Sequence, residues 1–204
     1  WSHIRIFPLS TQLNTLIEMP IQLTEKQLAD IQSEKQIEHI SYVVNKGVIL
    51  KTSENIEGII LKGVDLSQKI NNYNLQNTQN LPYTSDEIPI LLSQNTLDRL
   101  DCKIGAKIFV HVIDSHPKIF KGKVINSYST NIEEFDSKIA LSDIRTIQRL
   151  NNWKDEEYSW IELYIRNRNQ IGAIAHTLYQ KIPDVNVESI YNLFPQMFDW
   201  LALM

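Results

Sequence analysis

The pattern that most constrains the fold is a strand–helix–strand order that occurs at both ends of the chain. Near the N-terminus, Ile4 to Phe7 and Ile37 to Val44 alternate between polar and apolar residues, as strands do. Between them, Thr24 and Gln27 fit a capping box, which predicts a helix that runs to about Lys35.

The same order returns near the C-terminus. Trp160 to Ile165 is predicted to be a strand, and Val185 to Val187 a last strand. Between them, Asn169 can cap an amphipathic helix with apolar residues at positions i, i+3, i+4 and i+7: Ile171, Ile174, Ala175 and Leu178. Two such units can share one sheet as a split βαβ layer, so we predict an α+β fold in which both chain ends form that layer.

The middle of the chain is rich in predicted strands. We expect a turn at Asn45 to Gly47, a hairpin around residues 53–55 and a polar surface connection over residues 65–86. A strand from Ile88, a short helix capped by Ser93 and a second hairpin follow. The tip of the second hairpin is Asp114, Ser115, His116 and Pro117. We therefore expect residues 1–75 and 151–204 to form a discontinuous α/β subdomain, and residues 76–150 a β-rich inserted subdomain.

Residues 130–152 combine a predicted strand with a predicted helix. Phe135 to Leu141 mixes polar and apolar residues as a strand would. Ser142 is a suitable N-cap for the helix that follows. Asn152 can end this helix, since Asn tolerates the left-handed conformation that many helix ends require.

This stretch also resembles a known family. The segment IEEFDSKIALSDIRTIQRL, from Ile132 to Leu150, is similar to part of the extracytoplasmic domains of FtsX/MacB-type ABC transporter permeases, including the lipoprotein-releasing permeases LolC and LolE. Three further stretches resemble these domains in the same order, so that the resemblance covers residues 40–204: Ile56 to Asp65, Leu97 to Gly105, and Asn192 to Phe194 with Trp200 and Leu201.

The resemblance implies a Porter-like α/β part formed by both chain ends and a Sabre-like β-rich part between them. It implies a non-catalytic domain on the periplasmic side of the inner membrane, with membrane helices on both sides of the segment. Its partners would be an ABC ATPase and a second permease subunit, in a homo- or heterodimer. The function would be lipoprotein release, as in LolC and LolE, or MacB-like export.

The second hairpin tip is the candidate partner-binding site. In LolC-like relatives this connection is a longer hook that captures a periplasmic lipoprotein chaperone. Here it is only the four residues Asp114 to Pro117, which fits a LolE-like or MacB-like role at least as well. A periplasmic chaperone or adaptor is therefore a candidate partner.

The C-terminal segment is the candidate membrane-proximal site. Residues 194–204 are apolar on almost every side, and Met197, Phe198, Trp200 and Leu201 would lead toward a second membrane span. The alternative is a terminal helix that packs on the core. In a tethered domain, residues 1 and 204 should lie at the same end. No apolar run is long enough to span a membrane, and no signal peptide is visible, so the chain is either an excised piece or a cytosolic domain.

Composition and residue spacing indicate neither catalysis nor nucleic-acid binding. The net charge of −4 argues against a nucleic-acid surface. Cys102 is the only cysteine, and the five histidines show no metal-binding spacing. Glu133 and Glu134, as neighbours on a strand, would face opposite ways. We expect no enzyme activity, cofactor or metal. The alternatives are a small soluble hydrolase or transferase with a dispersed site, or a free-standing binding module.

Overall fold

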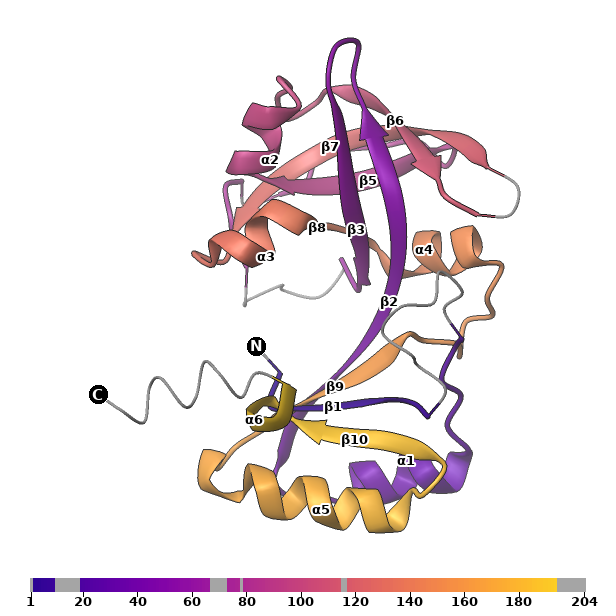
Figure 1. The fold of residues 1–204 in the computed structure, drawn as a ribbon, viewed down its shortest axis with the longest axis vertical. Coiled ribbons are helices and arrows are strands. Elements are labelled where there is room, and N and C mark those ends of the chain that lie inside the picture. Colours follow the sequence, from indigo (N-terminus) through magenta and orange to yellow (C-terminus); the bar gives the residue numbers. More distant parts are fainter. Residues whose placement is uncertain (1, 10–18, 67–72, 78, 115–116, 194–204) are drawn as a thin grey trace. The chain divides into compact units, whose positions relative to one another are not determined.

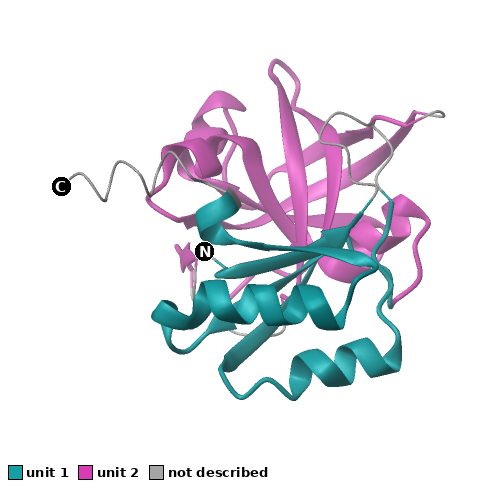
Figure 2. Ribbon diagram, turned by 60° about the horizontal axis from the view of Figure 1, so that its bottom comes forward, with its two compact units in different colours: residues 1–43, 156–204 teal, residues 44–155 magenta. Residues whose placement is uncertain are grey.

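The computed structural model describes residues 2–9, 19–66, 73–77, 79–114 and 117–193 (Figure 1). It divides into two compact units (Figure 2). The first combines Trp1–Val43 with Glu156–Met204, and the second is Val44–Asp155. Strand β2 (Ile37–Lys51) begins in the first unit and continues into the second. Strands and helices occur in both units, which confirms an α+β protein.

The first unit is built on a sheet to which both chain ends contribute. Its order is β10 (Val185–Ser189), β1 (Ile4–Pro8), β9 (Trp160–Ile165) and the first part of β2, and all neighbours are antiparallel. Strand β9 therefore lies between β1 and β2, which α1 (Glu25–Gln32) connects. Similarly, β1 lies between β9 and β10, which η1 (Arg168–Gln170) and α5 (Ile171–Lys181) connect.

The core of this unit forms where the two helices supply apolar faces to the sheet. The four predicted apolar residues of α5 are all buried, together with Ile31 of α1. They belong to one cluster with alternate residues of the strands: Ile4, Ile6, Ile161, Leu163 and Ile165. The predicted capping box is confirmed, because Thr24 accepts from the backbone of Gln27 and the Gln27 side chain accepts from the backbone of Thr24.

The second unit is a closed ring of six strands. In order around the ring, they are β2, β3 (Ile56–Val64), β8 (Ile139–Asp143), β5 (Glu87–Ser93), β7 (Lys118–Ser129) and β6 (Lys107–Val112), which pairs again with β2. The two-residue strand β4 (Asn74–Leu75) adds to β7. Alternate residues fill the interior, among them Leu50, Leu61, Ile90, Val110 and Val124. Ring closure leaves these six strands without a free sheet edge.

Short helices complete the described chain. They are α2 (Gln94–Arg99), α3 (Glu133–Lys138) and α4 (Ile144–Asn151) in the second unit, and α6 (Ile190–Leu193) in the first. Ser93 caps α2 as predicted, and Asn152 ends α4 in the left-handed conformation at φ 57°. The predicted hairpin of β6 and β7 is also confirmed.

Three local predictions were wrong. No turn interrupts β2 at Asn45 to Gly47, because these residues pair with Ile60 to Lys62 of β3. The predicted strand from Phe135 to Leu141 is strand only from Ile139, in β8, because residues 135–138 belong to α3; the acidic side chains of the first turn of α3 favour a helix start there. The N-cap of α4 is Asp143, whose side chain accepts from Thr146, while Ser142 belongs to β8 and donates to the Pro89 carbonyl.

The units divide at different residues from those predicted. The chain crosses between them after Val43 and after Asp155, whereas the sequence suggested divisions after residues 75 and 150. The reason is pairing: the second half of β2 bonds to β6, and β3 bonds to β8, so the β2–β3 hairpin belongs to the ring.

Candidate functional site

The predicted partner-binding hairpin tip is only partly described. Asp114 and Pro117 are exposed, and Ser115 and His116 lie outside the described residues. Asp114 forms an ion pair with Lys46 of β2, the strand next to β6. The Asp114 carboxylate lies 3.8 Å from Lys46 Nζ. Asp114 and Pro117 are thus accessible, and of these two described tip residues Asp114 offers a charged group.

The predicted membrane-proximal residues Met197, Phe198, Trp200 and Leu201 lie outside the described residues, as do residues 1 and 204. The nearest described positions lie together. Ile4 is opposite Ser189 in the β1–β10 pair, and the Ile190 amide donates to the His3 carbonyl at 2.9 Å. His3 and Ile190, which lie close to the two ends of the described chain, are therefore neighbours in the first unit.

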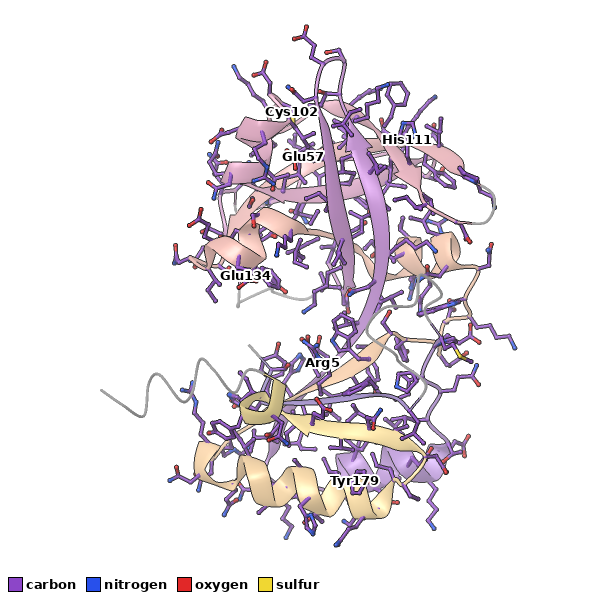
Figure 3. All side chains as sticks on the ribbon, in the orientation of Figure 1. Arg5, Glu57, Cys102, His111, Glu134 and Tyr179 are labelled. Atoms are coloured by element: carbon purple, nitrogen blue, oxygen red, sulfur yellow. The ribbon has the colours of Figure 1, made fainter. Side chains whose placement is uncertain are left out.

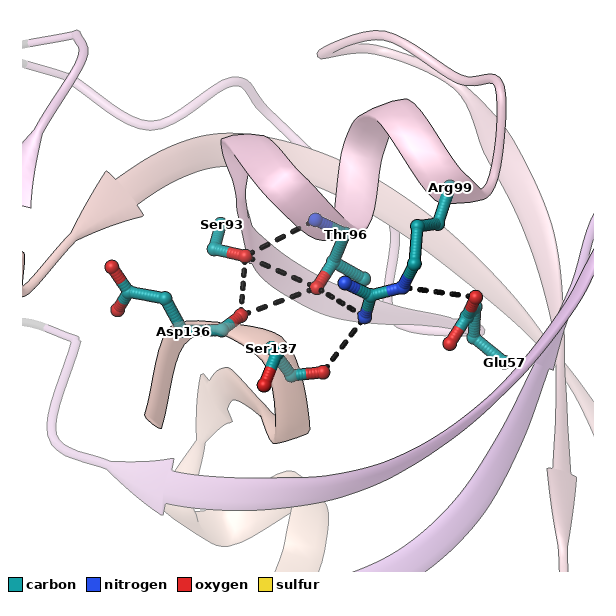
Figure 4. Close-up of polar contacts among 6 residues, drawn as sticks. All are labelled: Glu57, Ser93, Thr96, Arg99, Asp136 and Ser137. Atoms are coloured by element: carbon teal, nitrogen blue, oxygen red, sulfur yellow. Dashed lines mark hydrogen bonds and ion pairs between the residues drawn. The ribbon is translucent and has the colours of Figure 1, made fainter. Parts of the chain in front are cut away.

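A polar network, which we call the Arg99 network, joins four elements of the second unit: β3, the end of β5, α2 and α3 (Figure 4). Arg99 of α2 pairs through Nε with Glu57 of β3 at 3.0 Å, and its Nη2 donates to the Ser137 carbonyl of α3 at 2.7 Å. The hydroxyls of Ser93 and Thr96 both donate to the Asp136 carbonyl. Both hydroxyls therefore donate to a backbone carbonyl, and the network fixes α2 against α3 and β3.

A second polar cluster lies on the sheet of the first unit. Arg5 alternates with the core residues Ile4 and Ile6, so it lies on the sheet face away from that core (Figure 3). Its guanidinium stacks on Trp160 at 4.6 Å and lies 4.0 Å from Glu162 Oε1, which also accepts from Trp160 Nε1. Burial lowers the pKa of Arg5, and Glu162 and Glu188 oppose this effect, so the side chain remains charged.

Two titratable groups have pKa values set by burial. His3 accepts a hydrogen bond at Nδ1 from the Ile165 amide at 2.7 Å, and burial, together with Arg168, lowers its pKa. Burial, together with Asp101, raises the pKa of Cys102, which is half-buried. Its thiol stays protonated near neutral pH, unlike the thiolate of a catalytic cysteine.

Within the described residues, no group of three His, Cys, Asp or Glu could hold a metal ion. Sequence reasoning missed both polar clusters. The Arg99 network joins residues about 40 positions apart, which no local pattern connects. The Arg5 cluster depends on the register that sets Arg5 opposite Glu162.

None of the helices in the described ranges has both the length and the apolar composition of a membrane span.

No family model matches the sequence, and no curated protein matches it. Solved structures do match. The extracellular domain of the noncanonical ABC-type transporter YknZ from Gram-positive bacteria aligns with a TM-score of 0.53 and 12% identity, over 92% of this chain and 99% of that one. The periplasmic region of MacB from Actinobacillus actinomycetemcomitans aligns with a TM-score of 0.57 and 13% identity, over 97% of this chain and 92% of that one.

The chain has the fold of the extracytoplasmic domains of ABC transporter permeases. This confirms the resemblance found in the sequence. The match extends over both units of this permease-domain fold, because it covers nearly the whole chain.

Proposed function

We propose that the chain is a non-catalytic extracytoplasmic domain of an ABC transporter permease, which couples ATP hydrolysis elsewhere to substrate handling outside the membrane. The observation that carries this proposal is the fold that nearly the whole chain shares with the domains of YknZ and MacB. The local chemistry agrees: the Ser93 and Thr96 hydroxyls donate to a backbone carbonyl, and the Cys102 thiol stays protonated.

The first unit would be the Porter-like part and the second the Sabre-like part. The strand order β10-β1-β9-β2, with α1 and α5 as connections, supports a split βαβ layer in the first unit. The ring of the second unit supports a β-rich part inserted into it.

Membrane helices on both sides of the segment would tether the domain to the inner membrane, with this domain on the periplasmic side. The adjacency of His3 and Ile190 supports this arrangement, because two flanking helices must reach one membrane surface. Met197, Phe198, Trp200 and Leu201 would lead into the second of these helices.

The ATPase, fused or separate, and a second permease subunit would complete the transporter. The hairpin tip from Asp114 to Pro117 is the candidate site at which this domain contacts a periplasmic chaperone or adaptor. The transporter would act in lipoprotein release or in MacB-like export. Exposure of Asp114 and Pro117 supports this role.

The test is purification of the full-length gene product with its associated subunits in nanodiscs. We expect an ABC ATPase in the complex and ATP hydrolysis by the complex, while the 204-residue chain alone hydrolyses no ATP and holds no stoichiometric zinc. Hydrolysis by the isolated chain, or a full-length product that associates with no ATPase, would contradict the proposal.

A further inference from the structure

One side of the strand ring carries apolar residues that nothing in the described chain covers. We call this side the outer wall: the outward face of β2, β3, β6 and the start of β7, with Ile49, Ile56, Ile60, Phe109 and Ile119. Four of these are exposed by 40% to 62%, and Ile49 is half-buried. Strand register places Ile49 at the middle of the wall, because Ile56 and Ile60 on β3 and Phe109 on β6 are its diagonal neighbours. Lys51 lies between Ile56 and Phe109, and His111 lies between Ile49 and Ile119.

The opposite side of the same ring shows what a covered wall is like. There Leu91, Ile125 and Leu141 are fully buried beneath chain segments that include Leu75 and Phe135. Segments of this chain therefore cover one apolar side of the ring, while no described segment covers the other side. Contiguous exposed apolar surface of this kind is typical of interaction sites.

Two glycines shape the outer wall. Gly58 lies opposite Ile49, and Gly47 lies opposite Ile60, so each isoleucine stands beside a position without a side chain. A Cβ at either glycine would meet nothing within 4 Å, and neither has a positive φ. Gly63 and Gly122 differ, because neighbouring atoms there leave no room for a Cβ. Gly172, which is also open, lies alone on α5.

Glycine weakens a strand, and it often marks a place where another backbone approaches closely. Since neither turn geometry nor internal packing requires Gly47 and Gly58, a contact from outside the chain explains them best. A protein partner can place its own side chains over these two glycines, beside Ile49 and Ile60, where this chain has no side chain. A fluid lipid surface has no side chains at fixed positions to place there.

Charge narrows the choice of partner. Lys51, Lys107 and Lys121 occupy outward positions of the wall strands, in a chain whose net charge is −4. Lys107 lies 3.5 Å from Glu87 and Lys121 lies 4.0 Å from Asp86 at the β5 side, yet both lysine side chains remain more than 70% exposed. Two copies that met wall to wall would bring lysines together, which opposes self-association.

We propose that the outer wall docks a protein partner whose contact surface is apolar and carries acidic side chains. The acidic side chains would pair with the lysines, which lie among the apolar wall residues, and apolar side chains of the partner would lie over Gly47 and Gly58. This surface lies entirely within Val44–Asp155, and it is separate from the hairpin tip proposed as a chaperone or adaptor contact.

The test uses the 204-residue chain and two synthetic amphipathic peptides with the same leucine face, one with glutamates and one with lysines on the other face. Backbone amide NMR would locate binding. We expect the acidic peptide to shift amides of β2, β3 and β6 and to bind about tenfold more weakly to Phe109→Ser. Gly58→Val should weaken binding similarly without loss of folding, and Tyr179→Ser on α5, also an exposed apolar residue, should leave it unchanged.

Several outcomes would overturn the proposal. They are equal binding of the two peptides, shifts outside the wall strands, and unchanged affinity in Phe109→Ser. Binding of phosphatidylglycerol vesicles that is lost in Phe109→Ser, without peptide binding, would assign the wall to a membrane. Dimerisation that Phe109→Ser abolishes, measured by sedimentation velocity, would assign it to a second copy. None of these measurements needs an ATPase or a membrane anchor, so the result is independent of the transporter assignment.

Discussion

Arg99 connects three elements through one side chain. It reaches Glu57 of β3, Thr96 of its own helix and the Ser137 carbonyl of α3. Arg99→Met should lower the free energy of unfolding by about 1 to 2 kcal/mol, because it removes charge-assisted bonds from a partly exposed group. Urea denaturation measures this change.

Arg149→Met is the matched control, since Arg149 Nη2 bonds to Thr146 of the same helix at 3.3 Å. It should cost clearly less than Arg99→Met. Equal losses in the two variants would show that the Arg99 network does not fix α2 against α3 and β3.

His3 gives the fold a pH dependence of known sign. Its Nδ1 accepts from Ile165, so the neutral ring is the bonded form, and its pKa lies below the ordinary 6.5. The unfolded chain therefore binds this proton more readily, and stability is full above about pH 6.5 and falls as pH drops through the folded pKa.

The variant His3→Asn tests this effect, because Asn Oδ1 can accept the same bond and does not titrate. Stability curves of the two proteins, measured by urea denaturation from about pH 5 to pH 7, should differ in slope, with the wild type steeper. Parallel curves would mean that His3 does not cause the loss of stability at low pH.

Sequence reasoning at this scale succeeded where the cause is local. Thr24, Ser93 and Asn152 cap helices through neighbours within four residues, so a short motif shows them. Arg5 and Arg99 depend on partners far along the chain, and only the folded register brings Glu162 or Glu57 beside them.

At the scale of elements, pairing overrides local turn signals. Asn45-Lys46-Gly47 resembles a turn, yet β3 pairs with this segment directly, while β9 pairs with the part of β2 before it and β6 with the part after it. Helix α3 shows the reverse, since residues 135–138, which have a strand-like pattern, are helical. Its charged residues fit a first turn, and the Asp136 carboxylate accepts from the Thr130 amide and hydroxyl.

The two kinds of glycine in the ring give an element-scale prediction. A Cβ at Gly122 would come within 2.8 Å of Ile90 and 2.9 Å of Val110, inside the ring. Gly122→Ala should therefore destabilise the protein by about 1 to 3 kcal/mol. Gly58→Ala, with open space above the strand, should be neutral or stabilising by about 0.5 kcal/mol. Thermal unfolding of both variants distinguishes these effects, and a similar loss in both would contradict the assigned faces.

The whole molecule combines a discontinuous unit with a continuous one. Sequence reasoning predicted that both chain ends form an α/β part, because their strand–helix–strand patterns are strong and local. It placed the unit boundaries elsewhere because the sharing of β2 depends on long-range pairs with β3 and β6.

The continuous unit should fold alone. The ring pairs involve only residues within Val44–Asp155, so its hydrogen bonds close without the chain ends. An excised chain of residues 44–155 should unfold cooperatively on heating and give a dispersed amide NMR spectrum. A collapsed spectrum would show that the ring needs the first unit.

The central claim is that this domain lies outside the cytoplasm, attached to a membrane permease. The direct measurement is cysteine labelling of the full-length gene product in spheroplasts, with Cys102→Ser and Glu54→Cys. Residue 54 lies in the exposed β2–β3 turn, so its accessibility depends on the side of the membrane. A membrane-impermeant maleimide should label it before lysis, while a cytoplasmic control protein stays unlabelled. Labelling only after lysis would contradict the account.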